Sequence, residues 1–263
     1  MVVAAVCAAT AGHAQDDFAV IRDHDGYVNV RQGDVQSKIV GRITRRQPFD
    51  CWNGEDAGGT KFVDMVHVNY FDYVSGRPFA SNSQTQRPRV GYIHRSRVQR
   101  LREMPALKLR SATDARAVYA NDSLRVTIET VPFDAAKHKL GRGQYGVETI
   151  DGARFWGTDG GVPRRQVQSV GISGRSVPVF GRGATPGGRS ATSDSRETTL
   201  IFPRESIGDL FDLSLDTATI CIGAEGELYL WLQGGDGAAS YHVIWIVASG
   251  RIVCRYVALS FYV

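Results

Sequence analysis

The chain has 263 residues, of which 43% are hydrophobic and 22% are charged, and its formal net charge is +4. This length allows one large domain or two smaller ones. So mild a positive charge does not indicate a nucleic-acid-binding protein, because such proteins concentrate much more positive charge on one face, and we expect no nucleic-acid partner. Glycine is frequent, with 29 residues, and the apolar runs are short. These features predict an all-β fold with many turns.

The first fourteen residues differ in character from the rest of the chain. Residues 2–11 are small and apolar without a charge, and Gly12 and Ala14 put small residues at the two positions that a signal peptidase reads. This pattern predicts a signal peptide over residues 1–14 and a periplasmic or secreted protein. The alternative is an apolar tail without a signal function, because no Lys or Arg precedes the run. No segment approaches the ~20 uninterrupted apolar residues of a membrane-spanning helix, so we expect no membrane span.

Residues 25–31 predict a tight turn that runs directly into a strand. Asp25 and Gly26 favour the turn, because glycine accepts backbone angles that other residues resist. Val28 and Val30 then alternate with larger or polar residues, so we expect the two valines to face a core. The side chains expected on the outward face are Tyr27, Asn29 and Arg31.

Further short strands are expected at residues 18–21, 39–43, 49–52, 61–70 and 91–94, with a long polar insertion at 72–89. The chain resembles the bacterial SH3-like (SH3b) domain at two places. Its opening segment is similar to residues 25–31, Asp-Gly-Tyr-Val-Asn-Val-Arg, and its closing segment is similar to residues 91–94, Gly-Tyr-Ile-His. The resemblance implies an SH3-like small barrel over residues 17–102, in which the insertion lengthens one hairpin and covers or extends a binding groove.

The same resemblance implies a ligand. Exposed aromatic residues of such barrels line a peptide groove, and an arginine beside them can bind a carboxylate. The partner implied is peptidoglycan, through its stem peptides, or an envelope protein. The expected ligand-binding residues are Tyr27, Asn29, Arg31, Trp52, Tyr92 and His94. The alternative is that the aromatic residues only cap a small core.

After a short linker at 102–105, residues 105–263 predict an antiparallel β-sandwich-like domain. Its expected strands are residues 106–110, 124–131, 147–150, 167–172, 217–222, 227–233, 241–247 and 252–260, and a helical turn is expected within 202–211. A mobile loop is expected at 181–198, which is rich in Gly, Ser, Thr and Arg. Residues 151–163 and 235–245 resemble exported bacterial proteins that carry this β-rich domain, without an assigned activity, after an SH3-like barrel.

Two motifs bear on catalysis. Residues 141–146 match the spelling G-x-G-x-x-G, but a strand and a helix do not flank them as dinucleotide binding requires, so we interpret them as a flexible loop. Asp159 and Asp236 each lie in a Gly-rich stretch. They are either turn residues or, if they converge, a pair that binds a cation or acts as acid and base.

Three cysteines remain after the predicted cleavage. Cys221 and Cys254 lie in apolar strands and are either bridged or simply buried, and Cys51 lies in a short apolar strand where packing is its expected role. No spacing indicates a metal site, and we expect no cofactor.

The function expected from the sequence is non-catalytic binding in the bacterial cell envelope, with no enzymatic activity. One alternative is a periplasmic inhibitor or immunity-type protein. The other is a hydrolase whose site is built from the loops of Asp159 and Asp236.

Overall fold

The computed structural model describes residues 17–52, 62, 64–73, 79–174 and 198–260. The predicted all-β class is confirmed: antiparallel sheets dominate, and the one α-helix among the described residues is α1, Arg204–Ile207. The predicted signal peptide and nearly all of the predicted loop at 181–198 lie outside the described residues.

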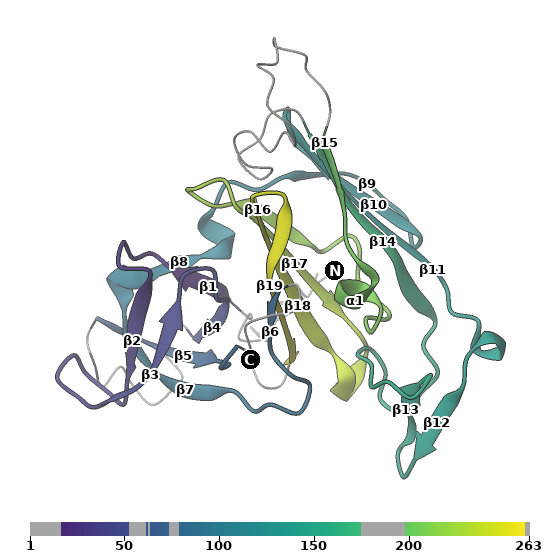
Figure 1. The fold of residues 1–263 in the computed structure, drawn as a ribbon, viewed down its shortest axis with the longest axis horizontal. Coiled ribbons are helices and arrows are strands. Elements are labelled where there is room, and N and C mark those ends of the chain that lie inside the picture. Colours follow the sequence, from purple (N-terminus) through teal and green to yellow (C-terminus); the bar gives the residue numbers. More distant parts are fainter. Residues whose placement is uncertain (1–16, 53–61, 63, 74–78, 175–197, 261–263) are drawn as a thin grey trace, which may run out of the picture.

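The N-terminal region forms a seven-stranded antiparallel sheet, here called sheet A (Figure 1). Its order is β3-β2-β7-β5-β4-β1-β8. The strands are β1 (Phe18–Ile21), β2 (Tyr27–Arg31), β3 (Ile39–Thr44), β4 (Phe49–Trp52), β5 (Met65–Tyr70), β7 (Arg89–His94) and β8 (Val98–Arg100). One apolar cluster includes side chains from all of them, such as Val30, Ile43, Val68 and Ile93. Within the described residues no pairing joins the edge strands β3 and β8, so the closed barrel stays a prediction.

Sheet B forms the middle layer of the molecule (Figure 1) and has the order β16-β17-β18-β19-β6. Its strands are β16 (Thr219–Ile222), β17 (Leu228–Gly234), β18 (Tyr241–Ala248), β19 (Arg251–Leu259) and β6 (Ala80–Ser81). All eight residues of β18 are buried. A strand buried on both faces reads as a continuous apolar run rather than an alternation, which explains the sequence of β18.

Sheet C covers one face of sheet B, with the order β15-β14-β11-β10-β9 (Figure 1). Its strands are β9 (Lys108–Ala112), β10 (Arg116–Ala120), β11 (Leu124–Pro132), β14 (Arg165–Gly174) and β15 (Thr198–Ile201). The largest core lies between sheets B and C and contains Tyr119, Ile128, Leu230 and Trp245. A separate hairpin, β12 (Leu140–Gly143) and β13 (Gly146–Ile150), replaces the loop that we expected at 141–146.

The other face of sheet B packs against sheet A. This second core contains Phe18 and Leu101 from the N-terminal region and Trp231, Ile244 and Tyr256 from sheet B. The predicted linker is part of the same junction: the Ile222 N–H donates to the carbonyl oxygen of Pro105 at 2.9 Å. Whether residues 17–102 and 105–263 fold independently therefore stays a prediction.

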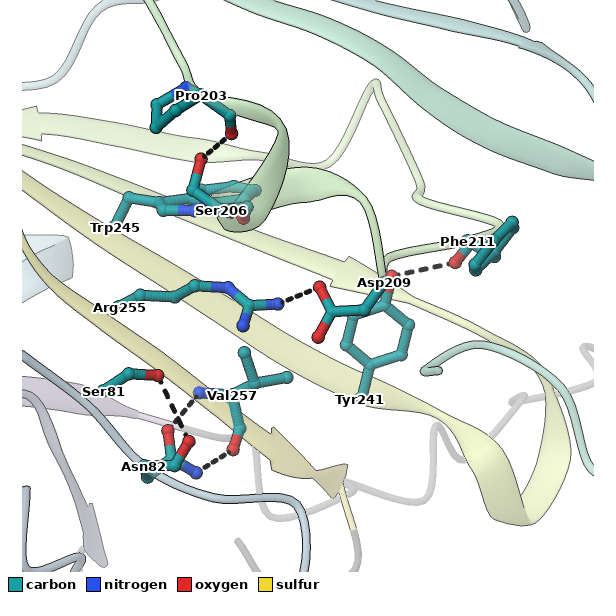
Figure 2. Close-up of polar contacts among 10 residues, drawn as sticks. All are labelled: Ser81, Asn82, Pro203, Ser206, Asp209, Phe211, Tyr241, Trp245, Arg255 and Val257. Carbon is teal, nitrogen blue, oxygen red and sulfur yellow. Dashed lines mark hydrogen bonds and ion pairs between the residues drawn. The ribbon is translucent and has the colours of Figure 1, made fainter. Parts of the chain in front are cut away.

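The insertion at 72–89 lies elsewhere than we expected. Instead of only lengthening a hairpin of sheet A, it supplies β6, which pairs in parallel with β19 at the edge of sheet B. The side chain of Asn82 completes the pairing (Figure 2): its Nδ2 donates to the carbonyl oxygen of Val257 at 2.5 Å, and its Oδ1 accepts the Val257 N–H at 2.8 Å. The amide side chain thus reproduces the two hydrogen bonds of a strand neighbour.

A buried polar group lies between α1 and sheet B (Figure 2). Arg255 is 6% exposed, and its Nη2 lies 2.5 Å from Oδ1 of Asp209. The Trp245 indole N–H donates to the carbonyl oxygen of Ser206 at 3.1 Å, which holds the short helix against β18. In the described part of the chain, no helix is both long and apolar enough to cross a membrane.

Candidate functional site

The candidate site is a row of four residues at directly paired positions across sheet A. Arg31 on β2 pairs with Tyr92 on β7, Tyr92 pairs with His67 on β5, and His67 pairs with Trp52 on β4. Residues that face each other across an antiparallel pair project to the same face of the sheet. Val30, which precedes Arg31 on β2, is fully buried in the core on the opposite face. We call these four positions the cross-strand row.

Aromatic contacts hold the middle of the row. The ring of Tyr92 lies 5.2 Å from that of His67 and 5.2 Å from that of Phe62, edge-on to both. Phe62 also lies over Gly33, where an added Cβ would come within 2.9 Å of its ring. A glycine at position 33 therefore leaves space for the Phe62 ring. The side chain of Trp52 lies outside the described part of the structure, so only its backbone position in the row is known.

Arg31 provides the permanent charge at one end of the row. Its Nη1 donates to the carbonyl oxygen of Ser37 at 2.8 Å, which ties the guanidinium to the turn between β2 and β3. A guanidinium has five N–H donors in a planar fork, so one bond to a carbonyl leaves donors for a carboxylate. The side chain is half-buried, which limits the conformational entropy that it loses on binding.

The remaining predicted residues flank the row. Tyr27 and Asn29 share the outward face of β2 with Arg31, and Tyr27 is 38% exposed. The guanidinium carbon of Arg42 on β3 lies 4.0 Å from the centre of the Tyr27 ring, a cation–π contact. The Nδ1 atom of His94 accepts the Ser96 N–H at 3.3 Å and so caps a short 3-10 helix. His94 therefore has a structural role at this nitrogen.

Burial lowers the pKa of His67 below its ordinary value of 6.5. The imidazole therefore remains neutral at neutral pH, when it offers both a donor and an acceptor. The row thus combines one guanidinium, one neutral imidazole and aromatic edges. Such a surface can bind a chain with a carboxylate and apolar groups, and its composition does not suggest a nucleophile.

Sequence reasoning missed His67 and Phe62. Both lie in the segment that we expected to be a strand at 61–70, whose residues we did not assign to a site. Only the register between β5 and β7 brings His67 beside Tyr92. That register depends on the whole sheet, so the local pattern held no signal for it.

The loops of Asp159 and Asp236 do meet, but through their glycines. A Cβ on Gly235 would lie 3.2 Å from the Cα of Gly157. Both carboxylate residues are exposed, and no hydrogen bond or ion pair joins them among the described residues. The described residues also contain no group of three or more His, Cys, Asp or Glu side chains that could hold a metal ion.

Cys221 and Cys254 lie in one row across sheet B, at opposite ends of it. Cys221 pairs with Tyr229, Tyr229 with Ile246, and Ile246 with Cys254. Three inter-strand steps of about 4.8 Å separate them by roughly 14 Å, whereas a disulfide requires Cα atoms within about 7 Å. The bridged alternative is therefore wrong, and both cysteines are buried free thiols.

Cys51 is also a buried free thiol, in the core of sheet A. Its Sγ donates to the carbonyl oxygen of Asp17 at 3.1 Å. Burial raises its pKa far above the ordinary value for a thiol. A thiol that stays protonated is a poor nucleophile, which favours the packing role.

Comparison of the chain with protein-family models, with curated proteins and with solved structures found no match.

Proposed function

We propose that the protein is a non-catalytic binding protein of the bacterial cell envelope. Its N-terminal region is an SH3-like barrel, and the outer face of sheet A binds a peptide. The ligand is a peptidoglycan stem peptide or an exposed segment of an envelope protein. The signal-like sequence at 1–14 and the SH3-like segments at 25–31 and 91–94 support this location and class.

The observation that carries the proposal is the cross-strand row. Arg31, Trp52 and Tyr92 were each expected to bind ligand, and they come from three strands far apart in the sequence. The register places all three at one level of the sheet, with His67 between two of them. A row of this length spans four strands, which suits an extended peptide better than a small ligand.

The chemistry of the row suggests how the peptide binds. Arg31 bears the charge that would pair with a carboxylate, and the ring edges of Tyr92 and Phe62 offer apolar contact. Aromatic side chains give a large contact area with little loss of conformational freedom. Binding should therefore weaken with added salt, because one essential contact is between charges.

The test is a pulldown of the full chain on purified peptidoglycan sacculi, with three variants. Arg31→Ala and Tyr27→Ala should weaken binding, with Arg31→Ala causing a loss of about tenfold if a charge-assisted contact is removed. Val30→Ala should instead lower stability by ~1–3 kcal/mol, because this side chain is buried in the core. The matched control is Arg110→Ala, an exposed arginine on β9 of sheet C.

One result would contradict the proposal, and another would decide between its two ligands. If Arg31→Ala and Arg110→Ala bind sacculi equally well, the row is not the site. If the wild-type chain does not bind sacculi but captures one envelope protein in a fixed ratio, the peptidoglycan ligand is excluded, and the same variants then test the row against that protein.

A further inference from the structure

A cleft lies in the C-terminal region, where sheet B meets the β12–β13 hairpin. Its volume is about 380 Å³, and it is lined by residues of five separate segments. They include Gln84 from the insertion, Glu148 on β13, Arg154, Phe155 and Trp156 from the loop after β13, and Leu259 at the end of β19. We call it the Trp156 cleft. It is distinct from the cross-strand row, which lies on sheet A.

Four polar groups of this cleft have no side-chain partner within the described part of the chain, whereas the hydroxyl of Thr158, which also lines it, donates to the carbonyl oxygen of Gly161 at 2.9 Å. The side chains of Gln84, Glu148 and Arg154 make no hydrogen bond or ion pair with another described residue, and neither does the indole N–H of Trp156. Some charged groups on the sheets are paired instead, as Arg116 is with Glu129 at 3.3 Å. The Trp156 cleft therefore collects donors and acceptors that are available to a ligand.

Trp156 and Phe155 form the aromatic wall of the cleft, and contacts with neighbouring aromatic residues hold both in place. The ring of Trp156 packs 5.9 Å from that of Tyr241, and Phe155 packs edge-on against Phe211 at 5.4 Å. The hydroxyl of Tyr241 donates to the carbonyl oxygen of Phe211 at 2.8 Å (Figure 2). Gly157, with φ 131°, comes so close to Phe211 that a Cβ would lie 2.5 Å from its carbonyl oxygen. These contacts pre-organise the wall.

The N-terminal region also contributes a residue to the cleft. Gln84 follows Asn82 by two residues, and Asn82 is anchored to Val257 on β19 by two hydrogen bonds (Figure 2). Leu259, two residues after Val257, also lines the cleft. The insertion thus brings an amide side chain to a site that is otherwise built by residues 147–259.

This combination of groups indicates the class of ligand. A sugar ring has C–H groups on its faces, which pack on aromatic side chains, and hydroxyls around its edge, which both donate and accept. Arg154 can only donate, ionised Glu148 can only accept, and the Gln84 amide does both. Small-molecule sites begin at about 300 Å³, so a cleft of about 380 Å³ accommodates one or two sugar rings.

We propose that the Trp156 cleft binds a hexose-based carbohydrate. The sugar stacks on the Trp156–Phe155 wall, and its hydroxyls bond to Glu148, Arg154 and Gln84. The protein then holds two sites, one for peptide on sheet A and one for glycan at the end of sheet B.

The test is titration of the full chain with three tetrasaccharides: chitotetraose, cellotetraose and maltotetraose. Binding is followed by isothermal titration calorimetry and tryptophan fluorescence. At least one sugar should bind. Chitotetraose binding alone would identify an N-acetylated glycan, whereas cellotetraose or maltotetraose binding would identify a neutral hexose polymer.

The variants Arg154→Met and Glu148→Gln should each lower the affinity by about tenfold, the usual loss when one hydrogen bond to a charged group is removed. Both side chains are exposed, so the melting temperature should stay close to that of the wild type. Trp156→Phe keeps an aromatic ring but removes the indole N–H and part of the stacking surface, and it should also weaken binding. Arg110→Met is the matched control for Arg154→Met, and Arg31→Ala should leave sugar affinity unchanged because that residue lies on sheet A.

The proposal is overturned if none of the three sugars binds, or if Arg154→Met and Glu148→Gln bind sugar as well as the wild type. It is also overturned if a free stem-like peptide binds and Arg154→Met abolishes that binding. That result would make the cleft a peptide site. Loss of sacculus binding in Arg31→Ala with normal sugar binding would support both proposals, whereas normal sacculus binding with loss of sugar binding would contradict both.

Discussion

The ring of Phe18 lies edge-on against the ring of Trp231, with 5.0 Å between the ring centroids and 78° between the planes. Phe18 belongs to β1 of sheet A and Trp231 to β17 of sheet B. The next residue, Ala19, faces the core of sheet A. Strand β1 therefore contributes to two cores, one on each side, and this explains why all four of its residues are buried.

We expect the chain to unfold in one cooperative transition because of this shared strand. Phe18→Ala should lower the free energy of unfolding by ~3–5 kcal/mol, the usual cost of truncating a fully buried Phe. Urea unfolding can be followed by far-UV circular dichroism and by tryptophan fluorescence. The curves from these two probes should coincide in the wild type, and they should also coincide in the variant. Two separated transitions would mean that the regions unfold independently.

A fragment of residues 17–103 is a second test of the shared strand. The sequence predicts that it folds alone as a small barrel. The structure argues otherwise, because the fragment would expose Phe18, Val20, Phe71 and Leu101, each at most 4% exposed in the whole chain. We expect it to aggregate or to give poorly dispersed NMR spectra. A well-dispersed spectrum would restore the prediction made from the sequence.

The ion pair between Arg255 and Asp209 should be costly to break from one side. Asp209→Ala leaves a guanidinium that is 6% exposed without its counter-charge, and such single deletions cost ~3–5 kcal/mol. Arg255→Met should cost less, because Asp209 is more exposed, at 29% of its side chain. The double variant should regain part of the loss.

Chemical denaturation of the three variants measures these differences. Asp134→Ala is the control, because its partner Lys137 is 78% exposed and an exposed ion pair contributes little to stability. Equal effects of Asp209→Ala and Asp134→Ala would show that water reaches Arg255.

The structure bears out the local patterns in the sequence more closely than the distant pairings. Alternation placed Val28 and Val30 on one face, and both lie in the core of sheet A. The meander of β16 to β19 was expected within a few residues of its bounds, because its apolar runs are long and end at glycine-bearing turns. A helical turn was expected within 202–211, and α1 begins there directly after Pro203.

The missed elements are those whose strand character comes from their neighbours. Strand β6 has only two residues, Ala80 and Ser81, and exists because β19 has a free edge beside it. Strand β15 is short and mostly exposed, and β10 lacks alternation because four of its five residues are buried. In the candidate site, the outward residues were predictable from period two, but the cross-strand row depends on register, which no single strand specifies.

The three described cysteines should remain unreactive in the folded protein. Burial raises the pKa of the Cys221 thiol to about 12 and raises those of Cys51 and Cys254 further. Since the thiolate is the nucleophile, a disulfide reagent at mildly alkaline pH should label these residues only after denaturation. Peptide mapping by mass spectrometry identifies the labelled sites. A peptide that links Cys221 to Cys254 would contradict the strand order of sheet B.

The last prediction concerns pH and rests on His67. Because burial lowers its pKa in the folded protein, the unfolded chain takes up a proton near the ordinary value of 6.5 while the folded protein does so only at lower pH. Between these two values the unfolded state binds more protons, so stability rises with pH across that window and falls as the pH drops below about 6.5. His67→Gln keeps a hydrogen-bonding side chain but does not titrate there. The stability of the variant should therefore depend less on pH than that of the wild type.

Urea unfolding of the full chain at pH 5, 6 and 7 checks the sign. The wild type should lose stability toward pH 5 more steeply than His67→Gln. Tyr27→Phe, on the same face of sheet A, is the control, because it removes only a hydroxyl and leaves His67 in place, so the wild-type slope should persist. If His67→Gln and the wild type lose stability in parallel, the protonation of His67 is not what links folding to pH, and the ring of His67 is more open to water than its place beside Tyr92 indicates.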